Sequence, residues 1–346
     1  LLVVAMAGSV GLEALVPLTG DTPRFVLRTY VEPPVDLTAY TSPLVGFRKY
    51  SGQKLAKVKS YYNQELLRVE AGGQLKYLRL AVLDDYSGQT WTATGGDGGP
   101  ETGFQRVGEV VPVEPMGEPV DTGITVLRGY ADNRDLSAWL PSLGQALSVR
   151  FEGQRSRDHA TSFRFNLSTS QGLVPDRLAA DDVIRARVVP LALVGSAEES
   201  SGGAPVVNEA TYEFLNSVIP KLTAGQGSPW EQLRTAMTKL RTDGFYSDGT
   251  NPGETQYKSG HGQSRLNGFV GGDMIVGSDE QYAATLALVA TELGYPARVV
   301  FGAIVPGSGV VQGKDVHAWV EIKTGDGTWK TIPPELFIPS RPPLKT

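Results

Sequence analysis

The chain has 346 residues, of which 40% are hydrophobic and 20% charged, so it can bury a sizeable core, and its length suggests two domains. The formal net charge of −5, with no run of Lys or Arg, argues against nucleic-acid binding. The sequence contains no cysteine, which excludes disulfides, thiolate metal sites and a cysteine nucleophile.

The two ends of the sequence differ from the rest. Residues 1–20 contain an apolar stretch that is too short for a membrane span of roughly 20 residues and lacks the basic residues of a signal peptide. This stretch is either a buried or interface helix or the end of a transmembrane helix, and we expect the second. The proline-rich residues 341–346 are expected to be a linker towards a further segment.

Residues 21–193 are expected to form a β-rich domain. The clearest strand is YLRLAVL at residues 77–83, whose apolar side chains alternate on one face. The turn residues DDYSG and then QTWTAT follow it, which predicts a hairpin. Shorter strands are predicted at residues 124–127, 147–153 and 162–168. The small, polar residues 194–207 are expected to be a linker between domains.

After this linker the pattern becomes helical. A helix is predicted to start at Ser228, where Pro229 takes the first helical position and Glu231 completes a capping box. Gly244 is expected to end this helix.

A second helix is predicted between Ser278 and Gly294. Ser278 caps its start, Gln281 closes a capping box, and Gly294 followed by Pro296 ends it. Its buried stripe is expected to consist of Tyr282, Leu286, Val289 and Leu293.

Strands follow this second helix. They are predicted at residues 297–305 and 316–324, and a tight turn at residues 325–329 leads into a third strand. Helices followed by an antiparallel sheet make this half of the chain an α+β arrangement.

Three sequence blocks in the C-terminal half occur in a characteristic order. They are GSDEQYAATLALVATELGYPARVVFG, DVHAWVEI and GTWKTIPPE. In order and spacing they resemble the core of the transglutaminase-like superfamily over residues 208–340. The resemblance implies an α+β fold in which a β-rich N-terminal domain precedes a papain-like or transglutaminase-like core, with a helix bundle packed on an antiparallel sheet.

The N-terminal half adds a weaker resemblance. The stretches VDLTAYTSPLVGFRKY, YLRLAVLDDYSGQTW and WLP are similar to the ectodomain of bacterial membrane-anchored transglutaminase-like proteins. This resemblance implies the extracytoplasmic part of a bacterial cell-membrane protein, with an actinobacterial source expected. Its contact with the membrane would be made by helices outside residues 1–346.

The chemistry that the resemblance implies is papain-like acyl transfer. It uses a thiolate at a helix N-terminus, a histidine on a neighbouring strand and an aspartate that orients the histidine. The corresponding positions here are Asp279, His317 and Pro333. Only the histidine is retained, so the triad is degenerate.

Asp279 has three interpretations. An acid in the first turn of a helix stabilises that helix, typically by about 0.3–1 kcal/mol, and its ionised carboxylate is a poor acyl-transfer nucleophile. We expect Asp279 to be structural and to pair with His317, the alternatives being a place in a binding cleft or a catalytic role. His317 is expected to be a satisfied, partly buried histidine rather than a base or a ligand.

The former substrate cleft is expected beside this pair. The residues predicted to border it are Ser278, Asp279, Glu280, His317, Trp319 and His261. Trp319 also suits the core, and His261 an ordinary loop. No cofactor or metal is expected, because a zinc site would require three histidines that lie far apart in the sequence. Arg298 is expected to form a structural ion pair.

The sequence therefore favours a non-catalytic, degenerate transglutaminase-like ectodomain of a bacterial membrane protein. Such a domain would bind a protein partner, a peptide or a cell-wall (peptidoglycan) fragment in the former substrate cleft, and no nucleic acid. The alternative is an active hydrolase or acyltransferase of the cell envelope that uses Asp279 and His317.

Overall fold

The computed structural model describes residues 35–343 with short gaps at 54, 56–57, 71–74, 95–102, 196, 204–208, 224 and 226. The described residues form one densely contacting unit. The predicted segment 1–20 and the last three residues of the predicted C-terminal linker lie outside the described residues. In the described part, no helix combines the length and the apolar character that crossing a membrane requires.

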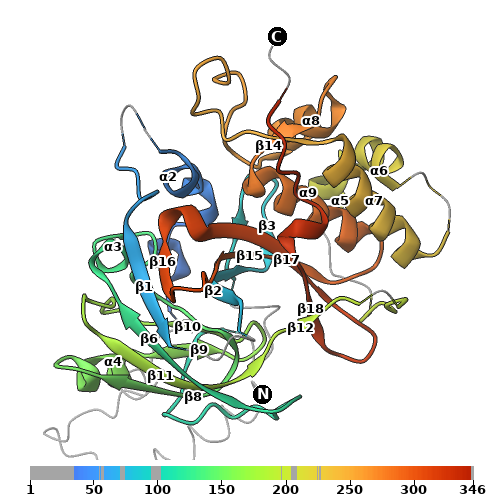
Figure 1. Cartoon of the computed structure of the whole chain (residues 1–346). Helices are drawn as coiled ribbons and strands as arrows, with labels where there is room; N and C mark the ends of the chain where they lie inside the picture. The colour runs from blue at the N-terminus through green and yellow to red at the C-terminus, as the bar shows by residue number, and fades with distance from the viewer. Residues whose placement is uncertain are drawn as a thin grey trace, which may run out of the picture. The chain divides into compact units, whose positions relative to one another are not determined.

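The first of two five-stranded sheets is antiparallel throughout and pairs a strand from the C-terminal half of the chain with strands from the N-terminal half (Figure 1). Its strands, in spatial order, are β16 (Val310–Gln312), β1 (Glu65–Glu70), β6 (Val120–Val126), β11 (Val183–Pro190) and β8 (Gly144–Glu152). The strands predicted around residues 124–127 and 147–153 are thus confirmed as parts of β6 and β8.

The second five-stranded sheet, which we call the central sheet, carries the predicted C-terminal strands. Its strands, in spatial order, are β12 (Ala192–Leu193), β18 (Trp329–Ile332), β17 (Val316–Lys323), β15 (Ala297–Ile304) and β2 (Tyr77–Leu83). All neighbours are antiparallel except β12 and β18, which are parallel.

Smaller sheets complete the β structure. A four-stranded sheet contains, in spatial order, β5 (Gln105–Arg106), β9 (Arg164–Asn166), β10 (Gln171–Leu173) and β7 (Trp139–Leu140). Two-stranded pairs are formed by β3 (Asp85–Tyr86) with β4 (Trp91–Thr92) and, in parallel, by β13 (Phe245–Tyr246) with β14 (Val276–Gly277).

The helices that follow residue 208 include the longest ones of the described part, and they group beside the central sheet (Figure 1). They are α5 (Glu209–Tyr212), α6 (Leu215–Thr223), α7 (Pro229–Asp243), α8 (Gln263–Gly271) and α9 (Asp279–Glu292). Short helices elsewhere are α2 (Arg48–Ser51), α3 (Arg128–Ala131) and α4 (Ser156–Ser162), with 3₁₀ turns η2 (Leu37–Ala39), η3 (Pro43–Gly46), η4 (Gly313–Asp315) and η5 (Pro334–Leu336). Helices packed on a mainly antiparallel sheet confirm the predicted α+β class.

The predicted helix starts are confirmed at α7 and α9. In α7, Ser228 Oγ accepts from the Glu231 N–H at 3.3 Å and Glu231 accepts from the Ser228 N–H at 2.8 Å, which is the reciprocal capping box. At α9, the Gln281 side chain accepts from the Ser278 N–H at 2.9 Å. Gly294 follows α9 with φ of +89°, a conformation that favours glycine.

The expected amphipathic stripe of α9 is not what the structure shows. Residues 279–291 are buried on all sides of the helix. β15 and β17 cover one side, and α6, α7 and α8 contact the others. A helix enclosed in this way needs small or apolar residues all around it, which the run of Ala, Leu and Val supplies.

The predicted hairpin after residues 77–83 also differs from the structure. The turn residues join the two short strands β3 and β4, whereas β2 pairs with β15, more than 200 residues further along the chain. All seven residues of β2 are buried, so its two faces are both covered. Alternation on one strand does not reveal such a distant partner.

The predicted division between residues 21–193 and 208–340 does not separate the sheets. β2, from the first range, is an edge strand of the central sheet, and β16, from the second range, is an edge strand of the first sheet. Neither sheet is complete without a strand from the other half, so the two halves fold together.

A buried group of three charges ties these strands to one another. Glu321 on β17 accepts from Arg79 on β2 at 2.9 and 2.7 Å and from Arg298 on β15 at 2.8 Å. The expected structural ion pair of Arg298 is therefore present. Burial by itself raises the pKa of Glu321, but the two guanidinium groups lower it to about 2.

Replacing Glu321 with Gln is predicted to lower the free energy of unfolding by about 3–5 kcal/mol, because two buried guanidinium groups lose their counter-charge. Urea titration measures this loss, with Arg150→Ala as the control, since Arg150 pairs at an exposed site and contributes about 1 kcal/mol at most.

The same variant has a pH signature. The folded-state pKa of Glu321 lies below its ordinary value of 4.5, so its stabilisation is complete above pH 4.5 and is lost as the pH falls towards 2. The stability of Glu321→Gln should lack this component of the acid dependence. An unchanged acid profile would contradict the assignment.

Candidate functional site

The carboxylate of Asp279 lies at the start of α9, and only 1% of its side chain is exposed. Oδ1 accepts from the Tyr246 hydroxyl at 2.8 Å. Oδ2 accepts from the Ala318 N–H at 3.3 Å and is bonded to Nδ1 of His317 at 2.7 Å. Both oxygens of the carboxylate are therefore occupied by partners from β13 and β17. The expected contact between Asp279 and His317 is therefore present.

His317 lies on β17 with 35% of its side chain exposed. Its Nδ1 faces an ionised carboxylate, which accepts only, so Nδ1 carries a proton and Nε2 is the nitrogen left for the cavity that the ring lines. Burial lowers the pKa of His317, but the charge and hydrogen bond of Asp279, with smaller contributions from Asp315 and Glu335, outweigh burial and raise it.

Tyr246 belongs to the site although the sequence did not single it out. Its backbone N–H donates to the carbonyl of Arg341 at 2.7 Å. The Arg341 guanidinium in turn donates to the Gly244 carbonyl at 2.8 Å and stacks over the Phe245 ring at 4.3 Å. The segment after η5 thus holds β13 in the position from which Tyr246 reaches Asp279. Burial and the neighbouring Asp279 raise the pKa of Tyr246 well above 10, so its hydroxyl stays a donor.

A cavity of about 470 Å³, which we call the cleft, opens beside this pair. Asp279 and His317 lie on its wall together with Tyr246. The apolar part of the wall consists of Tyr62, Ile304, Val316, Pro334, Ile338 and Pro339. Residues before β1, on the central sheet and after η5 therefore meet in the cleft, which no single stretch of sequence could indicate.

Two charged side chains of opposite sign also line the cleft, Glu335 and Lys314. Glu335 accepts from Tyr77 at 3.0 Å and from Lys76 at 3.1 Å. Burial raises the pKa of Glu335, but the hydrogen bond from its own backbone N–H and those from Lys76 and Tyr77 lower it more, so Glu335 is ionised at neutral pH. The apolar wall is thus bordered by polar groups that can orient a ligand.

The other predicted cleft residues lie elsewhere. Ser278, Glu280, Trp319 and His261 are buried and do not line the cleft. His261 accepts from the Trp91 N–H at Nε2 (2.9 Å), so Nδ1 holds its proton and donates to Glu280 at 2.8 Å. This neutral histidine fastens the start of α9 to the β3–β4 hairpin.

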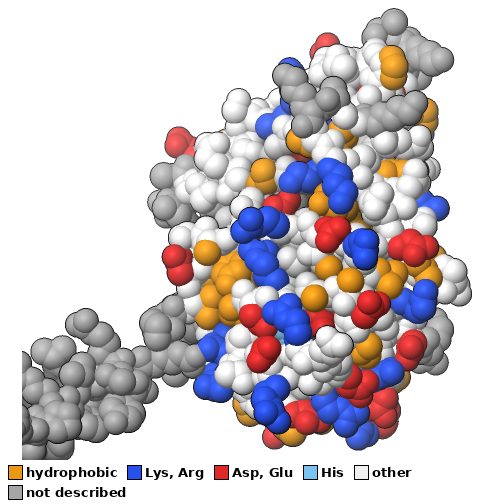
Figure 2. All heavy atoms as spheres, turned by 90° about the vertical axis from the view of Figure 1, so that its left-hand side faces the viewer, with side chains coloured by type: hydrophobic (Ala, Val, Ile, Leu, Met, Phe, Trp, Pro, Cys, Tyr) orange, Lys and Arg blue, Asp and Glu red, His pale blue; other side chains and the backbone are white. Residues whose placement is uncertain are grey.

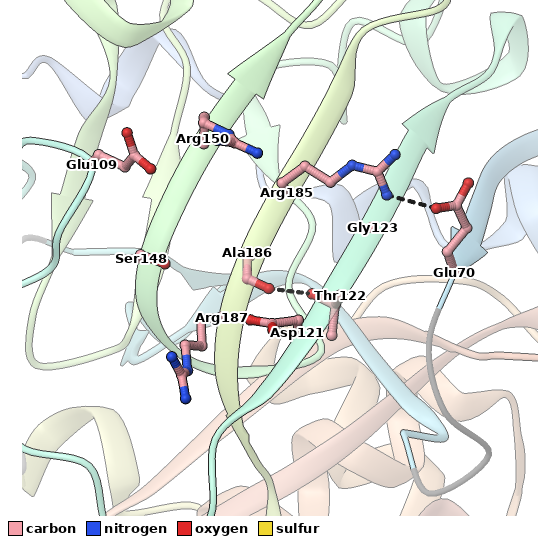
Figure 3. Close-up of a pocket in the computed structure, with 10 residues that line it drawn as sticks. All are labelled: Glu70, Glu109, Asp121, Thr122, Gly123, Ser148, Arg150, Arg185, Ala186 and Arg187. Carbon is pink, nitrogen blue, oxygen red and sulfur yellow. Dashed lines mark hydrogen bonds and ion pairs between the residues drawn. The ribbon is translucent and has the colours of Figure 1, made fainter.

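A larger hollow of about 590 Å³ lies on the charged face of the first sheet. Figure 3 shows Arg185 of β11 extending across Gly123 of β6 to Glu70, at 2.6 Å. A Cβ at residue 123 would lie 2.2 Å from this guanidinium, so the glycine leaves room for the crossing. Glu152 pairs with Arg185 and with Arg150 at 3.3 and 3.1 Å. These charges satisfy one another at an exposed site and leave no apolar floor for a ligand.

The space-filling view agrees with the pairing of opposite charges on the first sheet. On the face seen from the left-hand side of Figure 1, positive and negative side chains are interspersed and lie side by side at the level of the first sheet (Figure 2). In the described part of the chain, no three His, Asp or Glu side chains come close enough to hold a metal ion. The cleft beside His317, rather than the charged hollow on the first sheet, is therefore the candidate ligand site.

Comparison with known proteins agrees with the fold around this cleft. Residues 216–334 match the family model of the transglutaminase-like superfamily. This part of the chain is a transglutaminase-like domain. The sequence resemblance over residues 208–340 is confirmed in this respect. A search of curated protein sequences finds no match to the chain.

Solved structures extend the likeness beyond the transglutaminase-like domain. The periplasmic domain of TgpA from Pseudomonas aeruginosa, bound to ethylmercury, has a TM-score of 0.53 at 16% identity, over 88% of this chain and 98% of that one. A second structure of the same domain has a TM-score of 0.51 at 17% identity, over 84% and 90% of the two chains. At this level of identity the likeness concerns the fold.

The transglutaminase-like domain lacks an acid where the resemblance expects the residue that orients the histidine. Pro333 stands there, directly before η5. Asp279, from the position of the nucleophile, is the residue that bonds Nδ1 of His317. Its carboxylate is 1% exposed, and both of its oxygens take part in hydrogen bonds. Of residues 279, 317 and 333, His317 is the one whose ring nitrogen Nε2 lies outside the bond to Asp279 while its side chain lines the cleft.

The pKa of His317 in solution tests this electrostatic account. NMR titration of the imidazole C–H signals should give a pKa above 6.5, and Asp279→Asn should bring it below 6.5, because burial remains after the carboxylate charge is removed. The pair then stabilises the fold below pH 6.5 and loses this contribution as the pH rises through the folded-state pKa. An exposed control, Asp273→Asn, should leave the titration unchanged; an unchanged pKa in Asp279→Asn would contradict the pairing.

Proposed function

We propose that this chain is a non-catalytic transglutaminase-like ectodomain that binds a peptide segment, from a protein partner or a cell-wall fragment, in the cleft beside His317. The observation that carries the proposal is that the Asp279 carboxylate is buried and hydrogen-bonded. A carboxylate that is 1% exposed and bonded at both oxygens holds the scaffold together and is not available as a nucleophile.

The chemistry of the cleft supports binding. Its wall combines aliphatic side chains and prolines with a few polar groups, His317, Glu335 and Lys314, which is the usual composition of a site that binds an organic ligand. A peptide with an aliphatic side chain fits this pattern, since the apolar wall buries the side chain while the polar groups pair with the peptide backbone.

The proposed location is the extracytoplasmic side of a bacterial cell membrane. The likeness to a periplasmic domain over most of both chains supports it. The membrane contact would be made by helices outside residues 1–346.

Peptide binding can be measured on an array of random octapeptides. We expect the bound peptides to share an aliphatic residue, and Ile304→Asp, which places a charge on the apolar wall, to weaken binding about tenfold or more. Leu193→Asp makes the same change at an exposed position of the central sheet and should not affect binding. Equal loss in both variants, or no bound peptide, would contradict the proposal.

One observation favours a second function, a cell-envelope hydrolase. Because Asp279 orients Nδ1 of His317, Nε2 has the position of a general base that could activate water. Hydrolysis of peptide or ester substrates by the unmodified protein, abolished in His317→Gln, would favour this second function over binding alone.

The variant Asp279→Cys tests whether restoring the thiol alone is enough to restore acyl-transfer activity at this site. We expect no amide hydrolysis and no thioester with a reactive glutamine analogue, measured by mass spectrometry. The substitution restores the thiol but removes the carboxylate that is bonded to Nδ1 of His317, and Pro333 supplies none. Thioester formation in this single variant would contradict the degenerate site.

A further inference from the structure

The cleft does not end at Tyr246. A second cavity of about 400 Å³ lies on the other side of this residue, and the two share Ser51, Tyr62 and Tyr246 as lining residues. The second cavity is bordered by the end of α2 and by residues 247–252 after β13. Together the two cavities form one groove with an apolar compartment beside His317 and a second compartment beyond the tyrosines.

The second compartment has a different chemistry. Most of its remaining lining residues are polar: Gln53, Ser247, Asp248, Thr250 and Asn251. None of its lining residues is Lys, Arg or His, and Asp248 carries a negative charge, so an anionic ligand is disfavoured.

The loop that borders this compartment is held by its own hydrogen bonds. Asp248 Oδ1 accepts from the N–H and the hydroxyl of Thr250 at 2.9 and 2.7 Å. Ser247 and Asn251 both donate to Glu254, at 2.6 and 3.2 Å. Oδ2 of Asp248 and the amide oxygen of Asn251 have no bond within the described residues and remain as acceptors for a ligand that donates.

Backbone pairing with a ligand is blocked in this segment. The N–H groups of Phe245, Tyr246 and Ser247 donate to the carbonyls of residues 275, 341 and 277. Those of Gly249 and Thr250 donate to side chains of the loop itself. An extended peptide cannot add to this edge as a strand, so recognition here depends on side chains.

Side-chain acceptors beside two aromatic rings match one ligand chemistry. A pyranose ring has an apolar C–H face, which suits packing on aromatic rings, and hydroxyl groups that donate to carboxylate and amide oxygens. Tyr62 and Tyr246 are the aromatic residues that line this compartment. Where the compartments join, the hydroxyl of Ser51 is buried without a hydrogen-bond partner in the described part of the chain, an unsatisfied group that a bound polar ligand could satisfy after a side-chain rotation.

We propose that the second compartment binds a neutral sugar residue and that the ligand of the whole groove is a glycopeptide, with its sugar against residues 247–252 and an aliphatic side chain in the cleft. This proposal rests on the proposed function, because the peptide part occupies the cleft described above.

Isothermal titration calorimetry with neutral trisaccharides of N-acetylglucosamine, glucose and mannose tests the sugar compartment alone. We expect one of them to bind, and galacturonic acid trisaccharide, which is anionic, to bind at least about tenfold more weakly. Asp248→Ala should weaken the neutral sugar about tenfold, the effect of one lost hydrogen bond to a charged group.

Because Asp248 also supports its loop, Gln53→Ala is the second variant: Gln53 lines the compartment, and its side chain has no bond within the described residues. Gln256→Ala is its matched control, because Gln256 is an exposed glutamine that follows the loop and does not line the compartment. We expect weaker sugar binding in Gln53→Ala and none of this loss in Gln256→Ala. Sugar binding that is unaffected by both Asp248→Ala and Gln53→Ala would overturn the assignment.

The apolar variant distinguishes the two proposals. Ile304→Asp should weaken peptide binding about tenfold or more and leave the isolated sugar bound. In the unmodified protein, a covalently linked glycopeptide should bind more tightly than either part. Peptide binding without binding of any trisaccharide overturns the sugar compartment and leaves the proposed function standing. Binding of neither probe overturns both.

Discussion

One carboxylate shared by two buried arginines holds the central sheet together. Glu321 bonds Arg79 and Arg298, and these three residues come from β17, β2 and β15. The strand that Glu321 occupies also carries His317, and α9 packs directly on it. The distance between the start of α9 and His317, and with it the form of the cleft, therefore depends on a pairing that joins the two halves of the chain. Buried charges tolerate no loss of a partner, so this constraint is strict.

Within that frame, a single carboxylate has taken over two tasks. Asp279 places an acidic side chain in the first turn of α9, where it suits the helix dipole, and at the same time bonds Nδ1 of His317. A thiol could do neither as well, because it is a weaker hydrogen-bond acceptor. The arrangement is stable and closed: Tyr246 donates to one oxygen, and β17 supplies the donors for the other. What stays accessible is part of the imidazole, which is 35% exposed, and an apolar wall, the two features on which the proposed binding role rests.

Local signals predicted the helices and many of the strands. The capping residues of α7 and α9 lie within three residues of one another in sequence, so their pattern can be read directly. The pairing of β2 with β15 could not be read in this way, because a strand carries no local mark of a partner more than 200 residues away. For the same reason the sequence placed Ser278, Glu280, Trp319 and His261 at the cleft, while the structure buries all four.

The sequence by itself determined which chemistry is missing: it has no thiol at residue 279 and no acid at residue 333, and no folding can supply either. It also determined where α9 begins, because capping depends on adjacent residues. Only the tertiary structure decided that Asp279 would be sealed by Tyr246 and His317, and that Tyr62 and Tyr246 would join two compartments into one groove. Those contacts form between segments that are distant along the chain, and burial of the shared core, rather than any local preference, brings them together.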